Sequence, residues 1–262
     1  RSLGGDLRAG FRYNDHVSQA FTYTLSTRDI YNIVQGASLY ILNEQGSSTL
    51  SQLGTTLTFD YRDDRLDPTS GWLLALSTDF AGLGGTAKYL RLQANASYYI
   101  PLEHYLGNKQ WVLEFDGEVG DLIDLFGYHS LIADRFFLGG DNLLGFQTGG
   151  AGPHDTTYGD SLGGKFIYTG STVLHFPLPL SPDLGISGFA FTDIGSLTGV
   201  RPITVNGKQL GIYDNPAPRV SVGVGVAWNT PFGLIDLSFA EPVKKYKYDQ
   251  IEQFRVSFGT RF

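Results

Sequence analysis

The sequence predicts an all-β protein, an antiparallel transmembrane β-barrel of the outer-membrane type. Three observations indicate this fold class. Apolar and polar residues alternate through segment after segment, as in strands with one apolar and one polar face. Aromatic residues lie at the ends of these segments, where outer-membrane barrels carry aromatic girdles. Short and long connections also alternate, as the turns and loops of such barrels do.

The alternation is clearest at residues 90–100, where Leu90, Leu92 and Ala94 face away from Arg91 and Gln93. A period of two is legible in eleven segments, and no helical period competes with it. In chain order the segments cover residues 7–13, 21–26, 52–61, 72–80, 90–100, 111–119, 166–176, 185–193, 219–228, 234–240 and 253–262. Because they follow one another along the chain, we expect an antiparallel meander.

A soluble β-sandwich or barrel is the alternative, and it would bury the apolar face rather than expose it to lipid. Segments of about 9–11 residues favour the membrane, because a tilted transmembrane strand needs that length. The charges on the polar faces suit a wet lumen, since a midplane Arg or Lys facing lipid would cost roughly 2–4 kcal/mol. We expect the acidic row of Glu114, Asp116 and Glu118 to pair with Arg91 across the strands rather than to act in catalysis.

The connections indicate which end of the barrel faces the periplasm, and they suggest that the barrel has more than eleven strands. Tight connections lie at 14–17, 63–71, 101–110, 177–183 and 229–233, and long ones at 28–49, 121–164, 194–218 and 241–251, with the short 81–85 as an exception. Outer-membrane barrels place short turns in the periplasm, and bacterial single-chain barrels have an even number of strands. The first strand would then begin outside the cell, so residues 1–262 are expected to be the C-terminal part of a barrel with further strands upstream.

Composition excludes several classes of function. A net charge of −7 with a pI near 5.1 disfavours nucleic acid as a partner, which would require a basic surface. The absence of Cys excludes disulfides and thiolate metal sites. The five histidines lack metal-ligand spacing, and no Gly-x-Ser-x-Gly motif is present. We therefore expect no cofactor, no metal site and no enzymatic activity.

The long connection at 121–164 contains a stretch unlike its surroundings, RFFLGGDNLLGF at 135–146. Irregular loops longer than about 12–15 residues are usually functional or disordered. The apolar side chains of Phe136, Phe137, Leu138 and Phe146 argue against disorder. We expect a structured loop that folds back over or into the space that the strands enclose.

Three passages together resemble the BamA outer-membrane assembly family of the Omp85 superfamily. The first is the stretch at 135–146, which matches the sixth external loop of the family. The second is the turn YRDDRLDPTSG at 61–71. The third runs from WNTPFG at 228–233 through FAEPVKKY at 239–246 to FRVSFGTRF at 254–262. The resemblance covers nearly the whole chain in the family's order.

The resemblance implies a sixteen-stranded parent barrel preceded by POTRA domains, with this chain matching from about the sixth strand onward. It implies that the loop docks in the lumen through Arg135, Gly139, Gly140, Asp141, Asn142, Leu144, Gly145 and Phe146. The lumen acid that faces this loop would be Asp193. The last strand would serve as targeting signal and as one side of a lateral seam, through Phe254, Val256, Phe258, Gly259 and Phe262.

The sequence departs from the family at Leu144, where the family has an Arg that reaches toward lumen acids. Leucine offers no side-chain donor for a charge-assisted hydrogen bond. We therefore expect Leu144 to make no such bond, and we expect the loop to dock through Phe146 and the glycines.

The implied function is the insertion and folding of β-barrel proteins in the outer membrane of a Gram-negative bacterium. The implied partners are unfolded outer-membrane proteins, outer-membrane lipids and, through the POTRA domains, assembly lipoproteins. A polypeptide-secretion translocator of the same superfamily is the first alternative. A barrel phospholipase that uses His154 or His175, and a passive porin, are the others.

Overall fold

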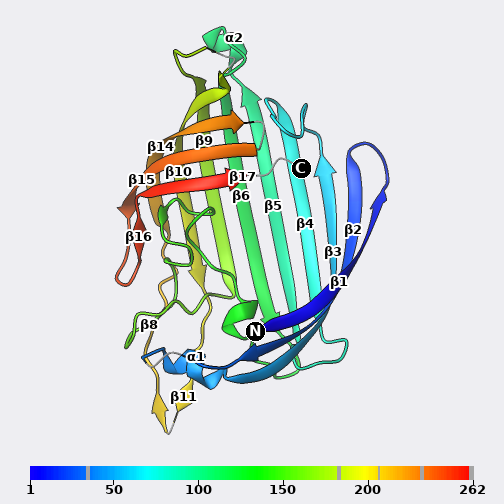
Figure 1. The fold of residues 1–262 in the computed structure, drawn as a ribbon, viewed down its shortest axis with the longest axis vertical. Coiled ribbons are helices and arrows are strands. Elements are labelled where there is room, and N and C mark those ends of the chain that lie inside the picture. Colours follow the sequence, from blue (N-terminus) through cyan, green and yellow to red (C-terminus); the bar gives the residue numbers. More distant parts are fainter. Residues whose placement is uncertain (34–35, 182–183, 206, 231–232, 260–262) are drawn as a thin grey trace.

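Eleven long strands form a single antiparallel sheet in chain order in the computed structural model, which describes residues 1–33, 36–181, 184–205, 207–230 and 233–259 (Figure 1). The strands are β1 Ser2–Arg12, β2 Val17–Ile30, β3 Gly46–Asp60, β4 Gly71–Ala81, β5 Tyr89–Pro101, β6 Val112–Asp124, β9 Phe166–Pro177, β10 Ile186–Thr198, β14 Arg219–Thr230, β15 Gly233–Lys244 and β17 Phe254–Gly259. The predicted fold class and the predicted order of strands are confirmed.

The strands are longer than the sequence pattern suggested. β2 has 14 residues and β3 has 15, because their pairing continues to Ile30 opposite Gly46. Backbone pairing needs no alternating side chains, so the ladder runs past the point where the apolar pattern fades. The connection expected at 28–49 is therefore shorter in the structure.

Short elements that the pattern did not predict lie within the connections. They are the helices α1 Leu39–Asn43 and α2 Glu103–Leu106, the 3-10 turn η1 Ile132–Asp134, and the two-residue strands β7 Gly145–Phe146, β8 His154–Asp155, β11 Thr204–Val205, β12 Lys208–Gln209, β13 Ile212–Tyr213 and β16 Ile251–Glu252. Local capping stabilises α1, since the Ser38 hydroxyl accepts a hydrogen bond of 3.2 Å from the Tyr40 amide. Elements this short leave no readable period in a sequence.

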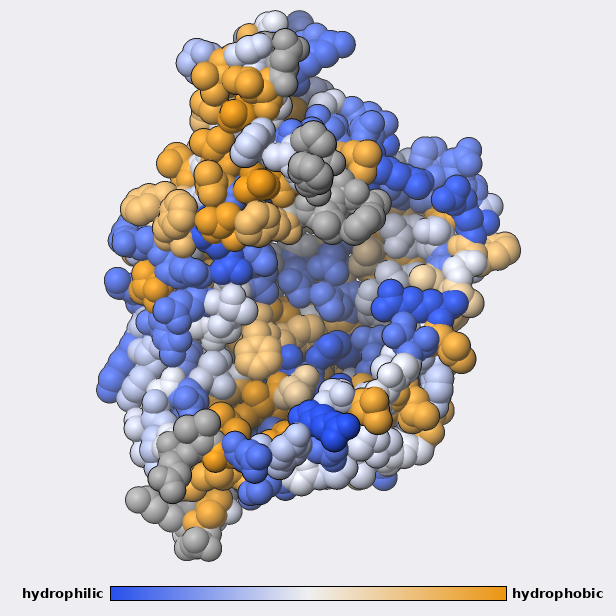
Figure 2. Space-filling model, in the orientation of Figure 1, coloured by the Kyte–Doolittle hydropathy of each residue, from blue (hydrophilic) through white to orange (hydrophobic). Residues whose placement is uncertain are grey.

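The apolar faces of the strands point outward and the polar faces inward. Leu7 on β1 is 75% exposed and Val119 on β6 is 51% exposed, whereas the side chain of Glu114 on β6 is only 17% exposed. The sheet curves around a central space, and the space-filling view shows a hollow with hydrophilic residues in its depth (Figures 1 and 2). This arrangement is that of a membrane barrel, with the apolar faces toward lipid.

The two ends of the sheet differ in their connections. The short turns, including the one with α2, gather at the upper end in Figure 1, and the connections with α1, β8 and β11 gather at the lower end. β1 and β17 are the outer strands of the sheet, and within the described residues they do not pair with each other. No helix in the described part of the chain is long and apolar enough to cross a membrane.

Candidate functional site: the docked loop and the last strand

The connection between β6 and β9, here called the docked loop (residues 125–165), folds back against the inside of the sheet (Figure 1). Its apolar side chains share a core with inward-facing residues of the strands. The loop contributes Phe136, Leu138, Leu143, Phe146 and Ala151, and the strands contribute Leu50, Ala81, Tyr89, Leu122, Ile167 and Leu197, with Ala87 from the β4–β5 connection. Burial of this size offsets the entropy of ordering a long loop.

Asn142 and Gly139 shape the tip of the docked loop. The Gly139 amide donates to Asn142 Oδ1 at 2.9 Å, and Asn142 Nδ2 donates to the Phe137 carbonyl at 3.0 Å. Gly139 has a φ of +114°, and a Cβ there would lie 2.1 Å from the Gln147 carbonyl oxygen. Only glycine fits this position, because it combines a positive φ with a close backbone approach.

The structure brings Leu144 and Asp193 together, in a way that the sequence did not suggest. The Leu144 backbone amide donates to Asp193 Oδ2 at 3.1 Å, and the Ser171 hydroxyl donates to Asp193 Oδ1 at 2.6 Å. The prediction that the Leu144 side chain offers no donor concerned the side chain only, and the main chain provides the donor here. The leucine side chain packs against the cluster of Phe189, Phe191 and Ala240 inside the barrel.

Phe146 is inside the barrel, 1% exposed, and belongs to a short ladder between the docked loop and the C-terminal part of the chain. In this ladder Phe146 is paired with Ile251, and Gly145 with Glu252. The Gln147 amide donates to the Gln250 carbonyl at 3.0 Å, which continues the ladder. The tip is thus anchored both to the wall at Asp193 and to the connection before β17.

Arg135 lies at the base of the docked loop rather than at its tip. Its guanidinium donates to the carbonyls of Leu162 and Ser130, each at 2.9 Å. These bonds hold the two ends of the loop together, because Ser130 lies near its start and Leu162 near its end. Asp141, at the tip, accepts a hydrogen bond of 2.7 Å from Arg255 on β17.

β17 forms the last strand of the sheet and, within the described residues, pairs with β15 alone. Its side chains at Phe254, Val256 and Phe258 are 60%, 41% and 76% exposed, on the outward face. Gly259 is the last residue of the strand, opposite Leu234. Phe262, expected to be the terminal targeting residue, lies outside the described residues.

The acidic row lines an internal cavity of about 730 Å³, but its partners differ from the expected ones. Glu114 contacts His175 at 2.6 Å, Asp116 accepts from Ser97 at 2.5 Å, and Glu118 accepts from Gln93 at 3.0 Å. The expected pairing with Arg91 is wrong. Strand register places Arg91 opposite Leu122, and its guanidinium binds the Asp134 carbonyl and lies 4.8 Å from the Phe136 ring centre.

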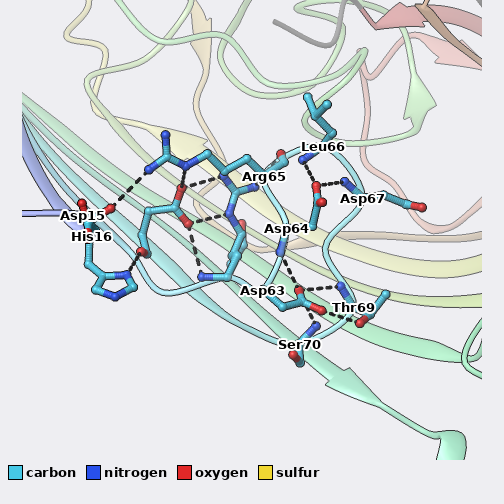
Figure 3. Close-up of polar contacts among 12 residues, drawn as sticks. Asp15, His16, Asp63, Asp64, Arg65, Leu66, Asp67, Thr69 and Ser70 are labelled. Atoms are coloured by element: carbon cyan, nitrogen blue, oxygen red, sulfur yellow. Dashed lines mark hydrogen bonds and ion pairs between the residues drawn. The ribbon is translucent and has the colours of Figure 1, made fainter.

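The turn between β3 and β4, which carries the second family passage, is held by its aspartates (Figure 3). Asp63 accepts from the amides of Thr69 and Ser70, each at 3.0 Å. Burial raises the pKa of Asp63, but these hydrogen bonds outweigh it and hold the pKa well below its usual range. Arg65 donates to the Asp15 carbonyl at 3.3 Å, which ties this turn to the preceding one.

Several residues that organise the site were missed by sequence reasoning. Arg219 and Asp249 form a fully buried ion pair, with both side chains 0% exposed. Arg255 and Ser257 contact Asp141 from the inner face of β17. Their place on the polar face of an otherwise apolar strand was a usable signal. Within the described residues, no group of three or more His, Asp or Glu could hold a metal ion.

Glu44 connects α1 to the docked loop and predicts a pH dependence. Both of its carboxylate oxygens accept from the Ile132 amide, at 2.9 and 3.0 Å. Burial raises the pKa of Glu44 to about 7, although the Ile132 amide and the charge of Arg135 oppose that rise. A raised carboxyl pKa means that the folded state binds the extra proton, so stability falls as pH rises from about 4.5 to about 7.

We therefore expect the docked loop to exchange its amide hydrogens faster at pH 8 than at pH 5, after correction for intrinsic exchange. Glu44→Gln keeps a carbonyl acceptor and cannot ionise, so the corrected rates of this variant should be equal at both pH values. Faster corrected exchange at pH 5 than at pH 8 in the unmodified protein would contradict the assignment.

Comparisons with known proteins agree with this architecture. The Omp85 superfamily domain family matches residues 1–262. "Outer membrane protein assembly factor BamA" of Neorickettsia risticii is 30% identical over 258 residues, which are 98% of this chain and 33% of that protein. "Sorting and assembly machinery component 50 homolog" of Bos taurus is 32% identical over 170 residues, 63% of this chain and 34% of that protein.

Among solved structures, the crystal structure of BamA from Haemophilus ducreyi lacking POTRA domains 1-3 has the same fold, with a TM-score of 0.77 at 22% identity. The match covers 97% of this chain and 53% of that one. The chain spans about a third of the Neorickettsia relative, 33% of its length. Because the family match extends over all 262 residues, the protein belongs to the Omp85 superfamily, and its barrel lies in an outer membrane.

Proposed function

We propose that this chain is the C-terminal, seam-bearing part of a barrel that inserts and folds other β-barrel proteins in the outer membrane. The relatives named as outer-membrane protein assembly factors support this assignment. The remaining strands and the POTRA domains would belong to the same parent protein. The observation that carries the proposal is β17 itself, an outer strand of the sheet whose side chains at Phe254, Val256 and Phe258 are exposed on the outward face.

The mechanism follows from the cost of an unpaired strand edge in a bilayer. Backbone N–H and C=O groups without partners in lipid cost several kcal/mol each. A client strand that pairs with β17 at the seam would satisfy these groups by β-augmentation. Phe254, Val256 and Phe258 would extend the apolar outer surface to the point of entry. No covalent bond is made or broken, so the activity needs neither a catalytic residue nor a cofactor.

The partners of the parent protein follow from this mechanism. Unfolded outer-membrane β-barrel proteins would provide the added strand, and outer-membrane lipids would surround the seam. Assembly lipoproteins would bind the POTRA domains.

The three alternative functions, a translocator, a passive porin and a phospholipase, agree less well with the docked loop and with the positions of the histidines. A translocator or a passive porin passes its cargo through the lumen, where the docked loop buries Leu138, Leu143 and Phe146 against the wall. A phospholipase would need an accessible general base, but His154 is 0% exposed. His175 is hydrogen-bonded to Glu114 on the inner face of the sheet, away from lipid.

Reconstitution of the full-length protein tests the proposal. A urea-denatured client barrel is added to liposomes with and without the protein, and folding is followed by the heat-modifiable gel shift of the client. We expect the protein to accelerate client folding at least tenfold over empty liposomes. Equal rates with and without the protein, or a steady ion conductance in planar bilayers, would refute the assignment.

A further inference from the structure

The tip of the docked loop contacts the last strand through an aspartate. Asp141 Oδ1 accepts from Arg255 Nε at 2.7 Å and from the Ser257 hydroxyl at 3.1 Å. Arg255 Nη1 also donates to Glu252 at 2.8 Å. Charged donors and acceptors form the stronger class of hydrogen bonds, so these contacts join two segments that are more than a hundred residues apart in sequence.

Arg255 and Ser257 lie on the inner face of β17, opposite to the outward-facing residues. The alternation along β17 places Phe254, Val256 and Phe258 outward and these two residues inward. The Arg255 side chain is 19% exposed and the Asp141 side chain 76% exposed, so solvent reaches this bond from the side of the loop tip. The docked loop therefore reaches β17 from inside the barrel, on the face opposite to its outward apolar side chains.

Within the described residues, β17 is joined to the sheet by a short ladder. It pairs with β15 over the six residue pairs from Leu234–Gly259 to Phe239–Phe254. Segments with few packing contacts open at low free energy, so contacts from the docked loop help to fix the position of β17. The contacts of Asp141 come from a loop that is itself anchored at Asp193 and at Ile251.

We propose that Asp141 is a positioning residue, which holds β17 through Arg255 and Ser257 so that the docked loop sets the place and register of the edge that accepts a client strand. The proposal rests on the function proposed above. It assigns the docked loop a role at the seam itself. A client strand can only be templated by an edge that keeps a defined position. Loss of the bonds from Asp141 to Arg255 and Ser257 should therefore widen the range of positions of β17 and slow client folding.

The test measures the position of β17 directly. Spin labels are attached at Val256→Cys on β17 and Leu76→Cys on β4, which are both outward-facing and both 41% exposed. Distances between the labels are measured by pulsed electron paramagnetic resonance in the full-length protein, free of other cysteines. Asp141→Asn and Arg255→Gln should each broaden the distance distribution at least twofold. Asp141→Glu should restore a narrow distribution, because it keeps the charge at the loop tip.

The double variant and a control separate positioning from a general loss of stability. If the two residues act as a pair, Asp141→Asn with Arg255→Gln broadens the distribution no more than either single change. Asp15→Asn, which removes the same charge from the exposed β1–β2 turn at the opposite edge of the sheet from β17, should leave the distribution unchanged. Additive broadening, or an unchanged distribution in Asp141→Asn, would overturn the proposal.

Client folding by the same variants completes the test. We expect the rate in Asp141→Asn to fall at least threefold, with recovery in Asp141→Glu. A broadened distribution with an unchanged folding rate would show that Asp141 positions β17 without affecting the edge that clients use, and would refute the proposal. If the unmodified protein accelerates no client, the proposed function fails, while the distance measurement still decides whether Asp141 holds β17.

Discussion

Replacement of Gly139 by valine is expected to release the docked loop and to reduce client folding by the full-length protein at least tenfold. Gly139 has a φ of +114°, which strains a β-branched residue by about 1–3 kcal/mol. A Cβ at this position would lie 2.1 Å from the Gln147 carbonyl oxygen, a distance that no side chain can occupy. The tip must therefore open, and the contacts of Leu144 and Phe146 will be lost with it.

Limited proteolysis and the client-folding assay measure this effect together. The docked loop should become cleavable from outside, whereas the strands stay protected. Gly84→Val is the matched control, since Gly84 also has a positive φ of +93° but a Cβ there would meet no atom within 4 Å. A Gly139→Val protein with a protected loop and normal client folding would contradict the role given to the loop.

Replacement of Arg219 by methionine is expected to destabilise the protein by about 3–5 kcal/mol, the usual result of leaving one charge of a buried ion pair without its partner. Arg219 Nη2 lies 3.2 Å from Asp249 Oδ1, and neither side chain is exposed. Arg219 also donates to the carbonyls of Asn215 and Ala217, at 2.8 and 3.2 Å. These acceptors, in the connections before β14 and after β15, would all lose the Arg219 donor at once, and within the described residues the Asp249 carboxylate would keep only the Tyr246 amide as a hydrogen-bond donor.

This loss should also reach the docked loop. Asp249 precedes Gln250, whose amide donates to the Gly150 carbonyl at 2.8 Å, so movement of the connection weakens the ladder with the loop. The stability is measured by heating the purified protein and following its unfolding through the heat-modifiable shift of its own gel band. Arg219→Met with Asp249→Leu should recover much of it, because both charges are then removed.

The exposed pair of Arg8 and Asp6 provides the control for this prediction. Its side chains are 77% and 44% exposed, and such surface pairs contribute about 0–1 kcal/mol. Arg8→Met should therefore leave the unfolding temperature nearly unchanged. Equal destabilisation by Arg8→Met and Arg219→Met would mean that burial of the ion pair is not what makes Arg219 important.

The pattern of side chains predicted the strands well because each face of a barrel strand meets a different solvent. Leu92 and Tyr98 alternate with inward polar residues for this reason, and their exposure follows the sequence closely. Register is a different matter. A period of two identifies the face on which a residue lies. It does not identify the residue that lies opposite on the next strand. The Arg91 prediction failed at this point, since β5 pairs Arg91 with Leu122 and places Asn95 opposite Glu118.

The docked loop was predictable as a structured loop and unpredictable in its contacts. Its glycines and aromatics indicated a folded tip, and the resemblance to a family suggested where it would lie. The donor to Asp193 is the backbone amide of Leu144. Nearly every residue type carries such an amide, so the residue type could not predict this bond. The same holds for Arg219 and Asp249, which are separated by 30 positions and meet only through the fold of two connections.

Site-specific cross-linking of a folding client to β17 tests directly whether clients pair with this strand. These 262 residues contain no Cys, so a single cysteine at Val256 on β17, or at Leu76 on β4 as the control, gives one defined attachment point in the full-length protein free of other cysteines. We expect a stalled client with a cysteine in its terminal strand to form a disulfide with Val256→Cys and none with Leu76→Cys. Equal cross-linking at both positions, or none at Val256→Cys while client folding proceeds, would contradict it.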